Sequence, residues 1–478
     1  MFAIPHSVQQ AIPIKQVYKN GIFMVEPKRY SRTYRFLDIN YAIASRESKE
    51  GIFLSYGELL NFFDSSTTFK ITVANRRINQ QEFEKDILIP LKDDGLDVYR
   101  QEYNQMLLDK SVGADGVIRE LYLTVTATKK NAAEAQSYFN RIGAKLAAHF
   151  ANLDSCCYVL NANERLRILH DFYRAGEEAY YHFDLKSAMQ KGHSFKDYVC
   201  PEDMALERDH FRMGDRWGRV FFLKDYANFI KDSILSDMTE ACKNIMLSID
   251  VTAIPTDEAV REIENRLLGV ETNITNWQRK QNANNNFSAV VPYDMELQRK
   301  EAKEFLNDLT TRDQRMMFAT VTVVITADSK EQLEADTDTL LTTARKHLCQ
   351  LAVLRYQQLA GLNTVLPIGV KRIQAIRTLT TEALSVLMPF RVREVVEKGG
   401  IYCGVNAISH NLIVPNRGNL LNPSGFVLGV PGAGKSMLAK MLIVFIALAT
   451  NDHILIYDPE GEYAPLIEAL SPLGVAVL

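Results

Sequence analysis

The chain has few cysteines, no long apolar run and no marked excess of charge of one sign. Its six cysteines include no C-x-x-C pair and show no disulfide framework, so we expect reduced thiols. The most apolar stretch, residues 441–450 (MLIVFIALAT), is far shorter than the ~20 residues that cross a bilayer, which favours a buried helix. Residues 1–16 lack a charged segment followed by an apolar core, so we predict no signal peptide and expect any membrane association to be peripheral.

The net charge argues against a protein that binds nucleic acid through an overall positive charge. With a net charge of −3, the chain has no global basic field of the kind that attracts nucleic acid, although a local basic groove remains compatible with it. Hydrophobic residues make up 47% of the 478 positions and charged residues 24%, which is ordinary for a globular protein. A chain of this length is expected to form roughly two to four folding units.

A strand–helix–strand–helix pattern occurs twice, around residues 117–175 and around residues 316–365. Asn131 is a plausible N-cap for the first helix of one copy, and Asp328 or Ser329 for that of the other. The predicted elements are, in the first copy, 120–128, 131–150, 155–160 and 163–173, and in the second, 318–327, 328–348, 351–356 and 357–362. The shared order predicts two related α+β units, although the sequence identity between them is thin.

Three further stretches have a recognisable pattern. Residues 68–78 alternate as a strand does, and residues 80–109 are polar and predicted to be helical. Two charged helices are predicted within residues 256–310, with Thr256 as the first N-cap and an Asn-rich exposed loop at 281–292 between them. Such a helical pair is either an arm that contacts a partner or a solvated surface element.

A change in composition near residues 393–400 indicates a domain boundary. We therefore predict an α+β N-terminal domain over residues 1–393 and a second domain over residues 394–478. The second domain is expected to open with a hairpin at 401–405 and 411–414.

Residues 429–436 (GVPGAGKS) match the phosphate-loop pattern G-x-x-x-x-G-K-[ST] at every fixed position. A short apolar strand is predicted before the loop at 425–428, and an apolar helix after it at 437–448. Glycines allow backbone N–H groups to approach phosphate closely, and a helix N-terminus favours an anion. The sequence therefore predicts the start of an α/β P-loop domain that binds ATP and Mg²⁺.

The residues of this loop have separate expected roles. Lys435 is expected to reach the β- and γ-phosphates, and the hydroxyl of Ser436 to ligate Mg²⁺. The residues expected to bind the nucleotide are Gly429, Val430, Pro431, Gly432, Ala433, Gly434, Lys435, Ser436 and Met437.

An acidic turn follows the next predicted strand, residues 453–457 (HILIY). Asp458, Glu460 and Glu462 come after its carboxyl end, where ligands bind in open α/β sheets. We predict Asp458 as a Mg²⁺ ligand, and Glu460 and Glu462, with Lys435, as catalytic candidates. The alternative is a structural turn in which Asp458 caps the following helix. The nine histidines show no ligand spacing, so no other metal is predicted.

The C-terminal stretch resembles the conjugative-transfer ATPases of type IV secretion systems, of the TrbE/CagE/TraC type. The motifs that carry the resemblance are GIYCGVNAISHNLIVPN (400–416), FVLGVPGAGKSMLAK (426–440) and ILIYDPEGEY (454–463), with weaker similarity at 377–390 and 359–369. The resemblance implies a RecA-like motor of the HerA/FtsK superfamily that hydrolyses ATP to drive assembly of a transfer channel or pilus and the passage of substrate.

The resemblance also implies partners and roles. Such motors are typically hexamers, cytoplasmic and peripheral at the inner face of the cell membrane, and they act with membrane-complex proteins, a coupling ATPase and, transiently, DNA. By position, Lys435 and Ser436 match the family's phosphate lysine and Mg²⁺ hydroxyl. Glu460 stands where RecA-like proteins place a catalytic glutamate, and Glu462 matches the Gly-Glu of the HerA/FtsK pattern, so the choice between them stays open.

The chain departs from the family pattern at its C-terminal end. The family's later strand ending in Asp-Glu, and the arginine supplied to a neighbouring subunit, have no counterpart in residues 1–478, as if the motor were cut off after its second core strand. We therefore expect a weak ATPase with a marginally ordered C-terminal segment, strand-like at GVAVL (474–478). Two alternatives are a HerA/FtsK-like DNA translocase and a non-catalytic docking module of the secretion complex.

Overall fold

The computed structural model describes residues 5, 7–77, 80–113, 117–227, 230–284, 290–312 and 314–470. The chain divides into two compact units. Unit 1 comprises Met1–Arg76 and Arg119–Arg391, and unit 2 comprises Arg77–Ile118 and Val392–Leu478. Unit 2 thus includes a segment, Arg77–Ile118, that the sequence analysis placed in the N-terminal domain. The strand expected at 474–478 lies outside the described residues.

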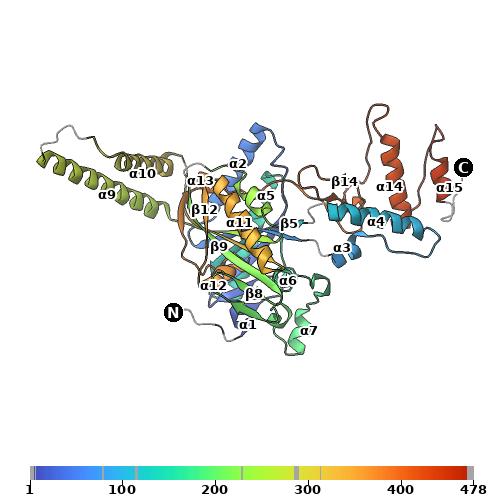
Figure 1. The fold of residues 1–478 in the computed structure, drawn as a ribbon, viewed down its shortest axis with the longest axis horizontal. Coiled ribbons are helices and arrows are strands. Elements are labelled where there is room, and N and C mark those ends of the chain that lie inside the picture. The colour runs from blue at the N-terminus through green and yellow to red at the C-terminus, as the bar shows by residue number, and fades with distance from the viewer. Residues whose placement is uncertain are drawn as a thin grey trace. The chain divides into compact units, whose positions relative to one another are not determined.

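Unit 1 is a mixed α/β structure built on a large antiparallel sheet (Figure 1). The strands are β1 (Gln16–Val17), β2 (Phe23–Glu26), β3 (Arg29–Phe36), β4 (Thr67–Arg77), β5 (Val117–Thr128), β6 (Cys157–Val159), β7 (Met204–Leu206), β8 (Phe211–Met213), β9 (Arg216–Tyr226), β10 (Ile245–Ala253), β11 (Met316–Ala327), β12 (Cys349–Val353) and β13 (Arg377–Thr380). The main path through the sheet is β1-β2-β3-β5-β4-β10-β11-β9-β8-β7.

Unit 1 also contains helices, most of which cover the two faces of the sheet. The helices are α1 (Val8–Ala11), α2 (Arg46–Asn61), α5 (Ala132–Asn152), α6 (Ala162–Tyr173), α7 (Leu185–Gln190), α8 (Ile234–Glu240), α9 (Thr256–Ala283), α10 (Tyr293–Thr311), α11 (Lys330–Lys346), α12 (Gln358–Val365) and α13 (Thr381–Ser385). Helices α9 and α10 extend away from the sheet (Figure 1). Helices α2, α5, α8, α11 and α13 contribute to one apolar cluster, and α1, α6, α7 and α12 to the other. Side chains of a strand alternate between the faces, as in β10, where Leu247 joins the first cluster and Met246 the second.

The two predicted copies have the same element order and the same pairing. Strand β3 pairs with both β5 and β6, and β9 pairs with both β11 and β12. The equivalent strands β4 and β10 pair with each other at the centre of the sheet. This arrangement confirms the predicted order of elements and is the one expected when two related α+β units share a sheet.

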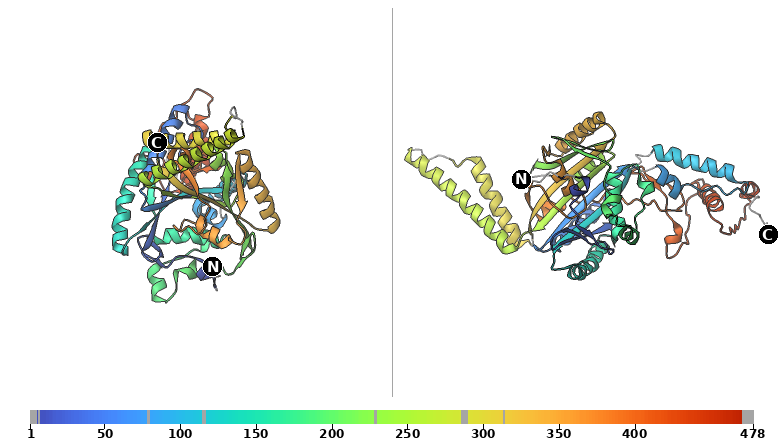
Figure 2. Two further views of the ribbon diagram at one scale, coloured as in Figure 1. Left: turned by 90° about the vertical axis from the view of Figure 1, so that its left-hand side faces the viewer. Right: turned by 90° about the horizontal axis from the view of Figure 1, so that it is seen from below.

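Each half of the sheet carries a helical insertion at the same place. In the second half, α9 and α10 lie between β10 and β11 and run side by side (Figure 2). In the first half, α3 (Gln80–Ile87) and α4 (Asp97–Gly113) lie between β4 and β5. The helical pair predicted within 256–310 is therefore confirmed, whereas the helical stretch predicted at 80–109 is interrupted at residues 88–96. Thr256 is not the N-cap, because the helix already begins there, after Pro255.

The second face of the sheet is polar at its centre because it supports a buried irregular segment. Residues 366–370 are buried and have no regular secondary structure. Lys70 on β4 donates to the carbonyl oxygens of Leu366 and Val370 over 3.0 and 3.1 Å, and Thr126 on β5 donates to that of Gly369 over 3.1 Å. A buried carbonyl without a donor costs about 1–3 kcal/mol, so these side chains make the segment's burial possible.

Unit 2 combines the α3–α4 insertion with the C-terminal part of the chain. It contains β14 (Gly404–Val405), β15 (Leu412–Ile413), α14 (Lys435–Ala449) and α15 (Ala464–Ala469). Strands β14 and β15 form the predicted hairpin. Tyr402, Leu412 and Val414 around it share a cluster with Phe83 and Leu107 of the insertion.

The strands predicted at 425–428 and 453–457 are not formed. Both segments have no regular secondary structure, and most of their apolar side chains are exposed, including those of Phe426 and Tyr457. A buried parallel strand needs neighbours on both sides and cover on both faces. Among the described residues of unit 2, the strands are β14 and β15, and they pair only with each other. Residues 425–428 and 453–457 have the apolar composition of strands, but the described part of unit 2 offers no neighbouring strand with which they could pair.

Candidate functional site

The phosphate-loop sequence forms a tight loop that opens helix α14. Two of its glycines adopt left-handed backbone conformations, Gly432 with φ 82° and Gly434 with φ 86°. An L-residue with a side chain is disfavoured there, which is the physical reason for glycine at these two positions. Gly434 is the N-cap residue of α14, and the helix starts at Lys435. The predicted loop-to-helix transition is therefore present.

The side chain of Lys435 lies across the loop. Its Nζ donates to the carbonyl oxygen of Val430 over 3.1 Å, and the N–H of Ala433 donates to the same oxygen over 3.2 Å. Space is tight at Gly429, where an added Cβ would lie 3.3 Å from the Cβ of Ala433 and 3.5 Å from Cγ of Lys435. A Cβ at Gly429 would therefore be tight against Ala433 and in ordinary van der Waals contact with the lysine stem.

Backbone amides for an anion are present at the start of α14. Leu438 N donates to Gly434 O over 3.0 Å as the first bond of the helix. The amides of Lys435, Ser436 and Met437 precede this bond, so helix geometry leaves them without an intrahelical acceptor. Ser436 and Met437 are solvent-exposed. The loop thus fits a triphosphate: it offers N–H groups, the positive end of a helix dipole and one ammonium group.

The acidic turn has a structural role for one of its three carboxylates. Asp458 Oδ1 accepts from the N–H of Gly461 over 3.0 Å, and Oδ2 from that of Tyr463 over 2.9 Å. Hydrogen bonds from backbone N–H groups, that of Tyr463 first, hold the pKa of Asp458 below its ordinary value. These bonds close the turn, as in the alternative interpretation, but Asp458 does not cap α15, because the N-cap of that helix is Tyr463 and it has no side-chain cap bond. A role for Asp458 in binding Mg²⁺ stays a prediction.

The other two acids, Glu460 and Glu462, are exposed. The turn that carries them lies beside α14, because the ammonium of Lys440 is 5.3 Å from the ring centroid of Tyr463. The structure thus brings the turn next to the loop helix without selecting one glutamate as the catalytic acid, and both assignments stay predictions. No group of three or more His, Cys, Asp or Glu suited to a metal ion occurs among the described residues.

The support of α14 at its far end comes from residues that the sequence analysis did not single out. Arg100 on α4 and Lys92 just before it donate to backbone carbonyls at the end of α14. Arg100 and Leu448 are some 350 positions apart, so no local sequence pattern could have predicted their contact. The sequence indicated only that residues 80–109 are polar and helical.

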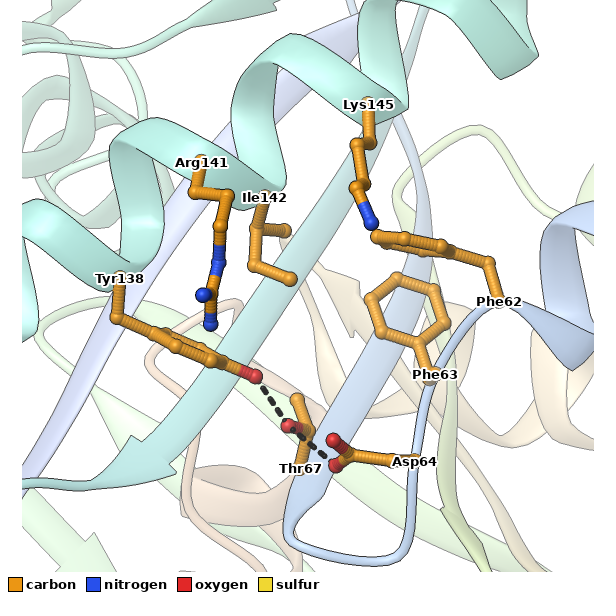
Figure 3. Close-up of a pocket in the computed structure, with 8 residues that line it drawn as sticks. All are labelled: Phe62, Phe63, Asp64, Thr67, Tyr138, Arg141, Ile142 and Lys145. Atoms are coloured by element: carbon orange, nitrogen blue, oxygen red, sulfur yellow. Dashed lines mark hydrogen bonds between the residues drawn. The ribbon is translucent and has the colours of Figure 1, made fainter.

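A second concave feature lies in unit 1 and is a weaker candidate. It is a pocket of about 190 Å³, smaller than the ~300–1,000 Å³ of typical ligand sites. Arg141 and Lys145 of α5 project over it, and Thr67 bonds to both Tyr138 and Asp64 (Figure 3). Among the described residues that line it, the Thr67 hydroxyl is shared by Tyr138 and Asp64, and the two cations lie over aromatic rings, Arg141 over Tyr138 and Lys145 over Phe62.

The phosphate loop lies in a stretch of the chain that matches a known protein family. Residues 418–478 match the family model for the central domain of HerA helicases. This stretch is similar to P-loop ATPases of the HerA/FtsK type. The match contains the glycine loop, α14 and the acidic turn, and it supports ATP binding, for which Mg²⁺ is the usual partner. No curated protein matches the chain.

The comparisons do not test the resemblance to the conjugative-transfer ATPases of type IV secretion systems. The rest of the chain lies outside the HerA match, so the specific likeness to conjugative ATPases stays a prediction. Among the described helices, none is both long enough and apolar enough to span a bilayer.

Proposed function

We propose that the protein is an ATP-binding motor subunit of the HerA/FtsK type that hydrolyses ATP to energise a conjugative or type IV secretion apparatus. The observation that carries the nucleotide part is the loop itself. Gly432 and Gly434 are left-handed, α14 opens directly after them, and Lys435 lies across the loop. These features supply the amides, dipole and cation that a polyphosphate requires.

Each residue would contribute differently to the bound state. The loop amides and Lys435 would hold the phosphates, and the exposed Ser436 hydroxyl is free to face a Mg²⁺ ion there. The bound metal would supply charge neutralisation at the phosphates. Glu460 or Glu462 would orient or deprotonate the attacking water, because both are exposed on the turn beside α14.

The secretion part of the proposal rests on the resemblance of residues 400–416, 426–440 and 454–463. In that setting the protein would act as a homo-oligomer, a hexamer by analogy, at the cytoplasmic side of the cell membrane. Unit 1 would dock on membrane-complex proteins and a coupling ATPase. Its size and its large sheet favour such a docking role over a role in catalysis.

A DNA translocase is the second candidate, and the HerA match favours it. A translocase hydrolyses ATP faster when it moves along DNA, whereas a secretion motor is regulated by its channel proteins. The net charge of −3 gives no general attraction to DNA, so translocation would require a local basic surface.

The test is ATP hydrolysis by the full purified chain with Mg²⁺, measured alone, with linear duplex DNA and with detergent-solubilised channel proteins. We expect slow Lys435-dependent turnover and retention of the chain by the channel proteins. Strong stimulation by DNA without such retention would favour the translocase. Retention without any nucleotide binding would identify a docking module and contradict the motor.

A further inference from the structure

Helix α14 has two ends with different requirements. Its N-terminal end carries the phosphate loop, while the carbonyl groups of its last turn have no intrahelical donors and carry partial negative charge. Cations near a helix C-terminus satisfy such carbonyls, but the last turn of α14 contains no basic residue. The donors for these carbonyl groups must therefore come from another part of unit 2.

One of these donors is Arg100 on α4, whose side chain is fully buried. Its Nε donates to the carbonyl oxygen of Leu448 over 3.0 Å. The rest of the guanidinium is held by Asp94, with contacts of 2.5 and 2.6 Å, and by Asp97 at 2.6 Å. A planar fork fixed by two carboxylates is aimed in one direction, so Arg100 is a rigid cap rather than a mobile surface charge.

Lys92 adds a second cation at the same helix end. Its Nζ donates to the carbonyl oxygen of Thr450 over 2.9 Å and to Oδ1 of Asn451 over 3.1 Å. The backbone N–H of Lys92 donates in turn to Asp97 over 3.0 Å. The turn before α4 is thereby locked to the carboxylate that also orients Arg100.

Apolar contacts complete the support. Ile89 and Leu96 of the insertion share a buried cluster with Phe445 and Leu448 of α14, and the ring of Tyr103 lies 5.8 Å from that of Phe445. The insertion therefore covers the apolar side of the last turns of α14 and also satisfies its terminal carbonyls.

The insertion has a counterpart of different sequence and length in the other half of the sheet. At the equivalent place in the second half, between β10 and β11, the chain carries the different hairpin α9–α10. Residues 77–118 group with the C-terminal part of the chain instead of with the sheet. Their buried contacts thus point to a role in the nucleotide-binding unit.

We propose that the α3–α4 insertion is a working part of the nucleotide site and that Arg100 is a positioning residue, which holds the phosphate loop by fixing the far end of α14. The proposal rests on the function proposed above. A packed helix moves as a rigid element, so loosening its C-terminal end displaces the amides at its N-terminal end. Because β4 and β5 flank the insertion in the chain, the segment that steadies α14 is also continuous with two neighbouring strands of the sheet.

The test compares matched arginine variants of the full chain. Arg100→Met removes the cap, and Arg219→Met is the control. Arg219 is also buried, also donates its Nε to a backbone carbonyl (Asp209, 3.1 Å) and also holds a carboxylate by two bonds (Glu334, 2.7 and 2.8 Å), but it lies in unit 1. The Kd for a non-hydrolysable ATP analogue with Mg²⁺ is measured by calorimetry.

We expect Arg100→Met to weaken analogue binding by about 5-fold or more, in the range of typical couplings between sites, and Arg219→Met to leave the Kd unchanged. The milder Lys92→Met variant keeps Arg100 and should weaken binding less, and Arg100→Lys should recover part of the loss. An unchanged Kd in folded Arg100→Met, with normal binding by the unaltered chain, overturns the inference alone. No binding by the unaltered chain overturns the proposed function, and the inference with it.

A second readout uses the reciprocity of coupling and applies even if Arg100→Met does not fold. Adding the analogue to the unaltered chain should slow amide hydrogen exchange at residues 94–103, which do not belong to the loop. A purely structural contact would leave that exchange unchanged, so identical exchange with and without the analogue overturns the positioning role.

Discussion

The ammonium of Lys435 donates to the carbonyl oxygen of Val430 over 3.1 Å, so the lysine lies across its own loop. The contact is partly exposed, and a hydrogen bond of this kind contributes only about 0.5–1.5 kcal/mol. A polyphosphate can therefore replace Val430 as the partner of the ammonium at small cost. The loop is held near the shape that an anion requires by its glycines and by α14 rather than by this bond.

The left-handed conformation of Gly434 leads to the first prediction. Alanine at φ 86° is disfavoured by roughly 1–2 kcal/mol, so Gly434→Ala should weaken binding of an ATP analogue by about 5- to 30-fold. The matched control is Gly51→Ala in α2, where an added Cβ meets nothing within 4 Å and the backbone is helical. Calorimetric titration of both variants checks the prediction. Equal affinities would show that the left-handed residue is not needed for binding.

The second prediction concerns the contribution of the buried pair Lys70 and Asp250 to the stability of unit 1. Their charged atoms lie 3.5 Å apart at the centre of the sheet, and both side chains are almost wholly buried. Lys70→Met leaves the Asp250 carboxylate without its cation and removes the ammonium donor from the carbonyls of Leu366 and Val370. Removing one partner of a buried pair typically costs about 3–5 kcal/mol of unfolding free energy.

Tryptophan fluorescence during urea unfolding measures this loss in unit 1. The chain has two tryptophans, Trp217 and Trp277, and both lie in unit 1. The double variant Lys70→Met/Asp250→Asn should lose less than the sum of its single changes, because neither charge is then left alone. A loss below about 1 kcal/mol for Lys70→Met would contradict the role given to the pair.

The third prediction concerns the acid response of unit 2. The hydrogen bond from Arg100 is the main cause that lowers the pKa of Asp94 from 3.8 to about 2. Because the folded-state pKa is the lower one, the pair stabilises the folded state fully above pH 3.8 and loses this contribution as the pH falls towards about 2. Amide exchange at residues 94–103 should therefore rise across this window. In Arg100→Met, Asp94 should titrate near its ordinary pKa, and a titration unchanged from that of the native chain would contradict the assigned cause.

Local patterns were enough to predict most elements but not the grouping of chain segments. Alternation and caps gave the helices and strands of both copies, and Asn131 and Ser329 do accept hydrogen bonds from their helices. The insertion at residues 77–118 could not be assigned to unit 2, because Arg100 and Leu448 are far apart in the sequence. Their contact depends on tertiary packing, which no local periodicity encodes.

The candidate site shows the same division. The glycine loop was predictable because its residues are consecutive and their types follow from backbone conformation. The strands at 425–428 and 453–457 were predicted from apolar composition, yet a strand also needs a paired neighbour, and the described part of unit 2 provides none. The role of Asp458 was left between metal ligand and turn cap, and its bonds to Gly461 and Tyr463 favour the turn.

Nucleotide binding by the full chain and by Lys435→Ala tests the account most directly. Calorimetry with a non-hydrolysable ATP analogue and Mg²⁺ should show saturable binding to the unaltered chain and none to the variant, while tryptophan fluorescence confirms that unit 1 stays folded. The variant loses the one ammonium that lies across the loop. Equal affinity in both proteins would contradict the assignment of the loop as the nucleotide site.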